Sequence, residues 1–104
     1  MNYQPHANLL PHEARFAIWL EENTPYLLPL FPLWDFENRR YKREQVTNYL
    51  SVCSTEEAIM CRFALAIWTN GIEDYDFNLF KAMRYLGDRE IQVIQNWVKD
   101  PWGC

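Results

Sequence analysis

Residues 54–71 read STEEAIMCRFALAIWTNG, and this stretch decides the fold class. Ser54 stands three residues before Glu57, the spacing of a capping box, in which each side chain accepts a backbone N–H of the other residue. From Ala58 to Trp68 the only charged residue is Arg62. The sequence therefore predicts a helix that is apolar almost all round and runs through the middle of the core, ending at Gly71 in a left-handed conformation.

Two amphipathic helices are expected before this stretch. Pro11 suits the first turn of a helix that runs to about Glu22. Its inward stripe is expected to be Phe16, Trp19 and Leu20. A second helix is indicated by apolar residues at the spacing i, i+3, i+4 and i+7, which are Val46, Tyr49, Leu50 and Cys53.

Two further helices are expected after it, separated by Gly87. Asp76 is expected to cap the first, and its core stripe is expected to be Leu79, Phe80, Ala82, Met83 and Leu86. Asp88 is expected to cap the second, which ends before Pro101. The core stripe of the second is expected to be Ile91, Val93, Ile94, Trp97 and Val98.

The segment TPYLLPLFPLW (24–34) carries three prolines, which argue against a regular helix. Its Leu and Phe residues are too many to leave in water, so we expect an extended arm that buries them in grooves of the helical body. No pair of strands is indicated. The sequence thus predicts an all-α protein, a compact bundle of about five helices with a proline-rich extended arm, forming a single domain over residues 1–104.

Composition indicates a protein that folds on its own core. Hydrophobic residues make up 49% of the chain and aromatic residues 16%. The cysteines, Cys53, Cys61 and Cys104, form no C-x-x-C pair and are odd in number, which favours a reduced, cytoplasmic setting. No signal peptide is indicated, and no apolar run approaches the roughly eighteen residues that span a membrane.

The residues suited to catalysis or metal binding are few. A calcium loop starting at Asp74 would need Gly at its sixth position and Glu at its twelfth, but these are Leu79 and Tyr85. His6 and His12 have no carboxylate or cysteine at a spacing typical of a dyad or metal site. We therefore expect a protein without enzymatic activity, cofactor or metal.

Two surfaces near the fourth helix are candidates for binding a partner. The first is acidic, with Glu73, Asp74 and Asp76, and would mimic phosphate toward a nucleic-acid-binding partner. The second combines aromatic and cationic side chains, as interface centres often do, and consists of Phe77, Lys81, Arg84 and Tyr85. Alternatively, the proline-rich arm covers the two aromatic rings.

The run NRRYKRE (38–44) is the densest in charge and contains Arg39, Arg40, Lys42 and Arg43. If it were helical, its cations would extend the apolar stripe of the second helix, and cations do not belong in a core. Either that helix starts near Arg43 and the run is a solvated loop, or the stripe leaves the body and becomes a basic groove for an acidic partner or a phosphate backbone.

The fourth and fifth helices also have the outline of a helix-turn-helix. The fifth exposes polar residues that can pair with base edges, namely Gln92, Gln95, Asn96 and Lys99. The net charge of −4 and the acidic residues around the hairpin oppose contact with phosphates. DNA binding is therefore an alternative to protein binding.

The capped helix STEEAIMCRFALAIWTNG (54–71) and the closing hairpin LFKAMRYLGDREIQVIQNW (79–97) resemble small, uncharacterised helical proteins of bacteriophages and other mobile elements. The resemblance implies a non-enzymatic inhibitor that occludes a surface on a host protein or protein complex, as anti-CRISPR and other anti-defence proteins do. A helix-turn-helix transcription regulator and a toxin-neutralising immunity protein are the alternatives.

Overall fold

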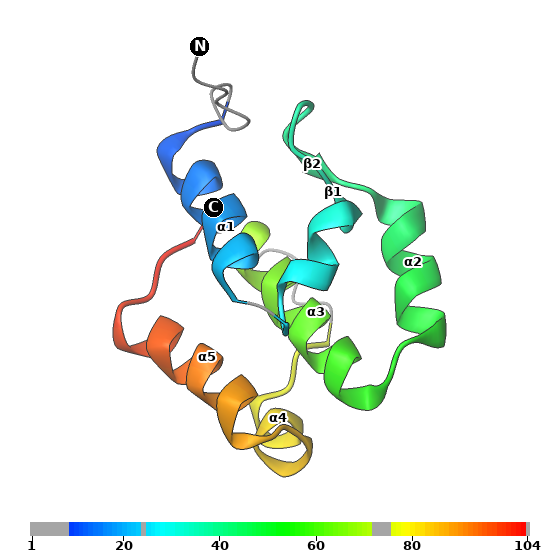
Figure 1. Cartoon of the computed structure of the whole chain (residues 1–104), viewed down its shortest axis with the longest axis vertical. Coiled ribbons are helices and arrows are strands. Elements are labelled where there is room, and N and C mark those ends of the chain that lie inside the picture. Colours follow the sequence, from blue (N-terminus) through cyan, green and yellow to red (C-terminus); the bar gives the residue numbers. More distant parts are fainter. Residues whose placement is uncertain (1–8, 24, 72–75, 104) are drawn as a thin grey trace.

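The central helix expected from the sequence is present as α3 (Thr55–Trp68), in a computed structural model that describes residues 9–23, 25–71 and 76–103. The capping box is formed, since the Glu57 N–H donates to Ser54 Oγ (3.2 Å) and the Ser54 N–H donates to Glu57 Oε1 (2.9 Å). α3 lies between α2 and α5 (Figure 1). It buries seven side chains, Ile59, Met60, Cys61, Phe63, Ala64, Leu65 and Ile67. Gly71 follows with φ +77°, as predicted.

α1 (Pro11–Glu22) has the predicted bounds. Of its predicted inward stripe, Phe16 and Leu20 are buried and Trp19 is half-buried against the core. The Phe16 ring is fully buried and contacts four tryptophan rings, with centroid distances of 5.7, 5.0, 5.1 and 6.4 Å to Trp19, Trp34, Trp68 and Trp102. Trp102 follows α5 and returns to α1, where it also meets the Trp19 ring. Trp102, which follows Pro101, is therefore partly buried and packs against the core.

The proline-rich segment is not extended, which corrects the sequence prediction. Its residues form a 3₁₀-helix, η1 (Leu28–Leu33), that packs against α1 and α2. A 3₁₀-helix has three residues per turn and a φ that proline adopts without strain, so prolines 29 and 32 are tolerated on its outer side. Leu27, Leu30 and Leu33 repeat at this spacing and are all buried, so the expectation that the segment buries its leucines is confirmed.

A small antiparallel sheet follows η1, although the sequence indicated no strands. β1 (Trp34–Asp35) pairs with β2 (Arg40–Tyr41) in the register Trp34↔Tyr41 and Asp35↔Arg40. The turn between them places Arg39 at φ +57°. α2 (Arg43–Val52) then begins at Arg43, as one of the two sequence hypotheses required.

α4 (Leu79–Tyr85) and α5 (Asp88–Lys99) form the closing hairpin, with N-caps that differ from the predicted ones. Asn78 caps α4, because its Oδ1 accepts the Lys81 N–H at 3.0 Å, whereas Asp76 has φ +59° outside the helix. Gly87 caps α5, and its N–H donates to Glu90 Oε1 at 3.2 Å.

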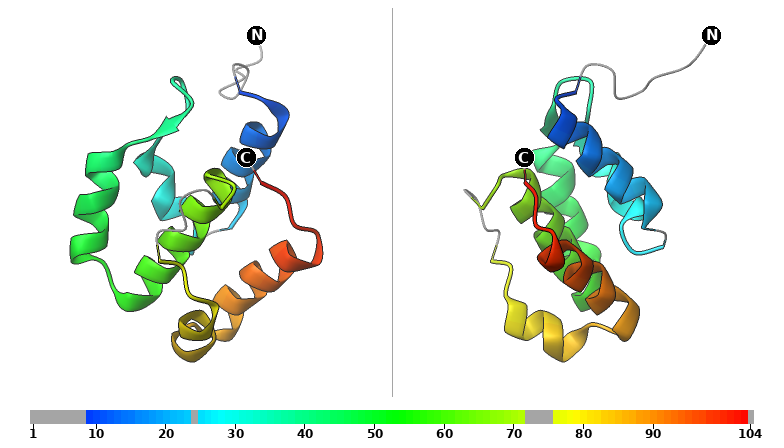
Figure 2. Two further views of the ribbon diagram at one scale, coloured as in Figure 1. Left: turned by 180° about the vertical axis from the view of Figure 1, so that it is seen from behind. Right: turned by 90° about the vertical axis from the view of Figure 1, so that its left-hand side faces the viewer.

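The two hairpins lie at opposite ends of the molecule. All views place β1 and β2 at one end, near the start of α1, and α4 at the other (Figures 1 and 2). A hydrophobic core connects them, with buried residues from every α-helix and from η1. The fold is thus a mostly helical bundle with a small two-stranded sheet. None of the helices in the described ranges is both long and apolar enough to cross a membrane.

Candidate functional site

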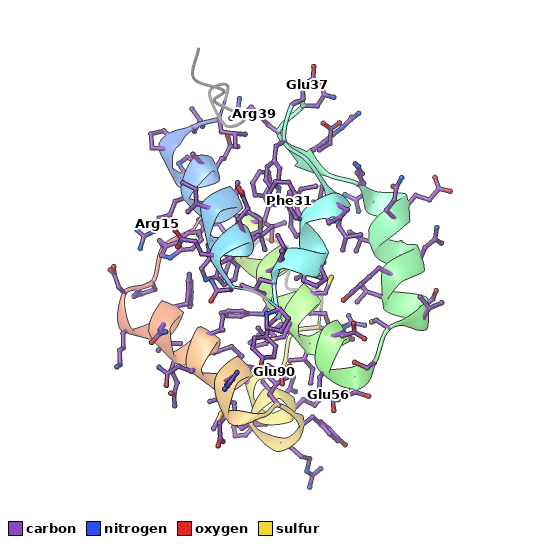
Figure 3. All side chains as sticks on the ribbon, in the orientation of Figure 1. Arg15, Phe31, Glu37, Arg39, Glu56 and Glu90 are labelled. Atoms are coloured by element: carbon purple, nitrogen blue, oxygen red, sulfur yellow. The ribbon has the colours of Figure 1, made fainter. Side chains whose placement is uncertain are left out.

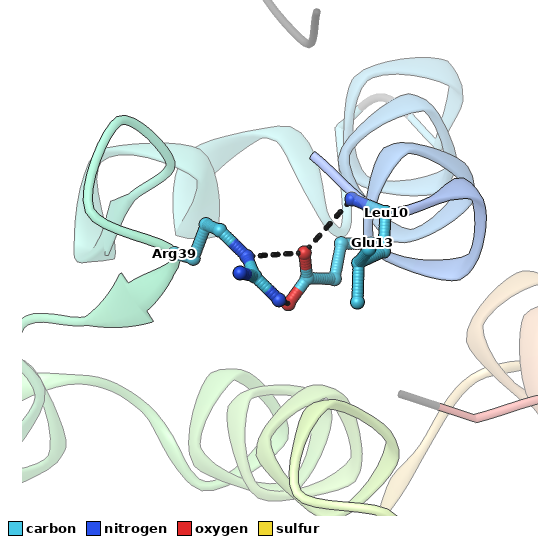
Figure 4. Close-up of polar contacts among 3 residues, drawn as sticks. All are labelled: Leu10, Glu13 and Arg39. Atoms are coloured by element: carbon cyan, nitrogen blue, oxygen red, sulfur yellow. Dashed lines mark hydrogen bonds and ion pairs between the residues drawn. The ribbon is translucent and has the colours of Figure 1, made fainter. Parts of the chain in front are cut away.

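Arg39, one of the four cations in the basic run, is bound to the body of the molecule through the buried Glu13, although its own side chain is 45% exposed. Its Nε donates to Glu13 Oε1 at 2.8 Å and its Nη2 donates to Oε2 at 3.3 Å (Figure 4). Glu13 Oε1 also accepts the Leu10 N–H at the start of α1, at 3.0 Å. Burial disfavours ionisation of Glu13, but the Arg39 and Leu10 hydrogen bonds outweigh it, so the pKa of this carboxyl is lowered. Arg39 thereby fastens the 34–43 hairpin to α1.

Two further cations of this run also have partners within the hairpin. Arg40 Nε lies 3.8 Å from Asp35 Oδ2, and the Arg43 guanidinium lies 5.3 Å from the centre of the Tyr41 ring. A pocket of about 490 Å³ is lined by Arg39, Arg40, Lys42 and Arg43, but also by Asp35 and Glu44. The run is therefore part of a two-stranded hairpin and not an irregular loop, although its four cations are exposed to solvent, as that hypothesis expected. Figure 3 shows Arg39 and Glu37 at this end of the molecule.

The acidic surface can be placed only in part. Glu73 and Asp74 lie outside the described residues. Asp76 is exposed and, with Lys81 and Arg62, lines a pocket of about 530 Å³ between α4 and the junction of α2 with α3. Two cations in the same wall dilute the negative charge that phosphate mimicry would need. The acidic surface stays a prediction.

Of the four residues of the predicted aromatic-cationic surface, one is half-buried and three are exposed. Phe77 is half-buried, and its ring lies 5.2 Å from the Phe63 ring of α3. The proline-rich arm does not cover it, because η1 packs against α1 and α2. Lys81, Arg84 and Tyr85 are exposed on α4. Three of the four predicted residues are thus available to a partner.

A larger apolar surface lies where the sequence predicted core. Of the expected core stripe of α4, only Ala82 and Leu86 are buried. Leu79, Phe80 and Met83 are 51%, 87% and 56% exposed, and Val98 of α5 is 57% exposed. We name these four residues the α4–α5 surface. Isolated exposed apolar residues are ordinary, whereas large apolar patches are typical of interaction sites.

The stripe was misassigned because α4 is apolar over most of its circumference. Periodicity alone does not tell which arc of a seven-residue helix faces inward. Ala82 is the residue that lets α4 approach the core closely, and it is 0% exposed. The available signal in the sequence was one small residue, Ala82, among large ones. A helix packs most closely through its small residue, and the large side chains then lie on the outside.

A pocket joins the two helices across this surface. Its volume is about 440 Å³, and its lining is Leu79, Met83, Ile91, Ile94, Gln95, Val98 and Lys99. Ile94 is buried and forms part of a fixed floor, whereas Met83 and Val98 form accessible walls. We call this feature the α4–α5 pocket. Its apolar walls with few polar groups suit an apolar side chain of a partner.

The polar arc predicted for DNA reading is exposed on α5, as expected for Gln92, Gln95, Asn96 and Lys99. The Gln92 side-chain amide donates to Asn96 Oδ1 at 2.8 Å. A base edge would have to compete with this bond. The arc has one cation, and α5 as a whole has two acidic and two basic residues. This is little charge for holding a phosphate backbone.

Few groups in the described residues suit catalysis. Burial raises the pKa of the Cys61 thiol to about 12, and burial also raises the pKa of the Cys53 thiol. Both are therefore protonated and poorly nucleophilic near neutral pH. Within residues 9–23, 25–71 and 76–103, no three His, Cys, Asp or Glu side chains gather as metal ligands do.

Comparisons with known proteins add no family to this description. The sequence matches no protein-family model and no curated protein, and the fold matches no solved structure.

Proposed function

We propose that the protein acts by binding another protein, with the α4–α5 surface as the centre of the contact. The observation that carries the proposal is the exposure of Phe80 at 87% on a helix whose neighbours Leu79 and Met83 are also half exposed. Burying these side chains against a partner would release apolar surface from water, the main favourable contribution in most protein associations.

The exposed residues are also of the types that interfaces use. Phe, Tyr, Met and Arg are enriched at interface centres, and the exposed side of α4 presents Phe80, Met83, Arg84 and Tyr85. Phe80 is expected to be the energetic centre, since a large aromatic ring brings much contact area with few rotatable bonds.

The form of action that we propose is occlusion of a surface on a larger host protein. This follows the resemblance of the capped helix and the closing hairpin to small phage and mobile-element proteins, among them anti-defence inhibitors. A partner encoded by the same element, as for an immunity protein, would use the same surface.

The test is affinity capture from a nuclease-treated bacterial lysate with three tagged baits, quantified by mass spectrometry. The baits are the natural protein, Phe80→Asp and Val52→Asp. Val52 is the matched control, because it is apolar, 83% exposed and at the end of α2. We expect a defined partner that the natural protein and Val52→Asp retain and that Phe80→Asp loses.

The proposal fails if all three baits retain the same proteins to the same extent. It also fails if the natural bait retains DNA instead when nuclease is omitted, with binding that falls steeply as salt rises. That second outcome would support the helix-turn-helix alternative and the polar arc of α5.

A further inference from the structure

We propose that the α4–α5 pocket receives an amphipathic helix of the partner whose apolar face is bordered by acidic residues. This inference rests on the proposed function and specifies the chemistry of what that surface binds. The observations behind it are the apolar lining of the pocket, the length of α5 and the net positive charge of residues 79–99.

The pocket has the form that a helix occupies in helix-in-groove complexes. Its apolar lining comes from two helices that meet at the turn around Gly87, and Ile91 and Ile94 of α5 face Leu79 and Met83 of α4 across it. A helix that presents apolar residues at i, i+3, i+4 and i+7 fits such a strip. Met83 adds a flexible wall that adapts to the inserted side chains.

The length of α5 sets the length of the helix that fits. α5 has twelve residues, so it is about 18 Å long at 1.5 Å per residue. Val98 extends the apolar strip to its last turn. A partner helix of about three to four turns would therefore contact the whole strip.

The charged residue in the pocket lining is a cation, Lys99 of α5. Arg84 is exposed on α4, outside the pocket lining, and α4 has no acidic residue. Asp88 and Glu90 lie in the first turn of α5, and Glu90 accepts the Gly87 N–H. Acidic residues beside the apolar face of a partner helix would thus meet Lys99 at the pocket and the net positive charge of residues 79–99 around it.

Charge also argues against a second copy of this chain in the pocket. Residues 79–99 contain four cations (Lys81, Arg84, Arg89, Lys99) and two anions (Asp88, Glu90), a net charge of +2 within a chain of −4. A two-fold dimer through this surface would place one positively charged segment against its copy. An acidic helix gains attraction from the same charges.

The experiment uses a displayed library of helices about four turns long. Apolar residues are fixed at i, i+3, i+4 and i+7, and the flanking positions are randomised over Glu, Lys and Gln. The library is selected on the natural protein after depletion on Met83→Glu. Met83 is 56% exposed, so this variant places a charge at the pocket wall without disturbing the core. Selected helices are then synthesised with a fluorescent label and titrated by anisotropy.

We expect Glu to be enriched at the flanking positions. Affinity should fall roughly tenfold or more in Met83→Glu, as for loss of an interface centre, and should be unchanged in Val52→Asp. In the double variant Arg84→Glu, Lys99→Glu, the preference should turn from Glu to Lys. Enrichment of Lys, absence of any charge preference, or failure to select binders that depend on Met83 would each overturn the inference.

Two other occupants give outcomes of their own, and each would overturn the inference. Self-association in sedimentation that Met83→Glu abolishes would assign the pocket to a second copy. Binding of the natural protein, but not of Met83→Glu, to vesicles with anionic lipid would assign it to a membrane surface. Failure of the inference also differs from failure of the proposed function, since a captured partner that depends on Phe80 would leave protein binding intact whatever the library selects.

Discussion

The 34–43 hairpin at one end of the molecule and the α4–α5 surface at the other use their residues in opposite ways. The hairpin concentrates four cations, yet Arg39 is fastened to the buried Glu13 and Arg40 lies beside Asp35. The α4–α5 hairpin concentrates apolar residues, yet Leu79, Phe80 and Met83 face water. Arg39, which the sequence offered to a partner, is engaged in the fold, whereas apolar residues that the sequence assigned to the core are exposed.

The largest expected effect tests whether the hairpin is part of the folded core. Trp34 of β1 is 4% exposed, and its ring lies 5.0 Å from the Phe16 ring. Trp34→Ala should lower the free energy of unfolding by about 3–5 kcal/mol, the usual cost of deleting a buried aromatic side chain. Urea unfolding followed by far-UV circular dichroism measures it. A loss below about 1 kcal/mol would mean that the hairpin only rests on the surface.

The next effect tests the ion pair that fastens the hairpin to α1. Glu13→Gln should cost about 1.5–3 kcal/mol, because it removes a charged acceptor from Arg39 and weakens the bond to the Leu10 N–H. Arg40→Gln is the control. The Arg40 side chain is 73% exposed and its contact with Asp35 spans 3.8 Å, so its loss should cost under about 1 kcal/mol. Equal losses would contradict the assignment of Arg39 as the anchoring cation.

The same pair has a pH signature. The folded-state pKa of Glu13 lies below its ordinary value of 4.5. The pair therefore contributes its full stability above about pH 4.5 and loses it as the pH falls through the folded-state pKa. The difference in unfolding free energy between the natural protein and Glu13→Gln should shrink on acidification below that pH. A difference that stays constant down to the acid transition would show that ionised Glu13 contributes nothing.

A smaller effect distinguishes the two sides of α4. Ala82 is 0% exposed where α4 meets the core, so Ala82→Leu should cost about 1–3 kcal/mol through overpacking. Met83→Leu, one residue further along, should leave stability unchanged. Thermal unfolding compares the two variants directly. A stable Ala82→Leu would mean that α4 packs loosely and that its inward arc is not fixed.

The smallest expected effect is on Phe80. Phe80→Asp should change the free energy of unfolding by no more than about 0.5 kcal/mol, since the ring is 87% exposed. The same substitution is expected to abolish partner binding. A loss of several kcal/mol would show instead that Phe80 supports the fold, and the α4–α5 surface would lose its central residue.

Much of the helical framework was predictable because its signals are local. The capping box at Ser54 and Glu57, Pro11 at the first turn of α1 and Gly71 after α3 each act within one turn of the chain. The 3₁₀-helix η1 also has a local signal in the sequence, since its leucines and prolines both repeat every three residues. The three prolines exclude a regular α-helix, but they do not exclude a 3₁₀-helix, whose φ proline adopts without strain.

The features that escaped prediction depend on contacts between distant parts of the chain. Nothing near Arg39 in the sequence indicates that Glu13, 26 residues away, accepts its hydrogen bonds. Likewise, the inward arc of α4 is decided by how closely Ala82 approaches the core, which periodicity within α4 does not contain. The sequence and the structure thus direct attention to the same helix, α4, but the sequence assigned its large apolar residues to the interior.

The tryptophan cluster around Phe16 determines what the intrinsic fluorescence of the protein reports. Trp19, Trp34, Trp68 and Trp102 all contact that ring, and Trp97 donates its indole N–H to the Trp102 carbonyl oxygen at 2.8 Å. All five tryptophans of the chain thus belong to one connected group. No tryptophan lines the α4–α5 pocket. Intrinsic emission therefore reports the integrity of the core, and a ligand that fills the pocket without disturbing the fold should leave that emission unchanged.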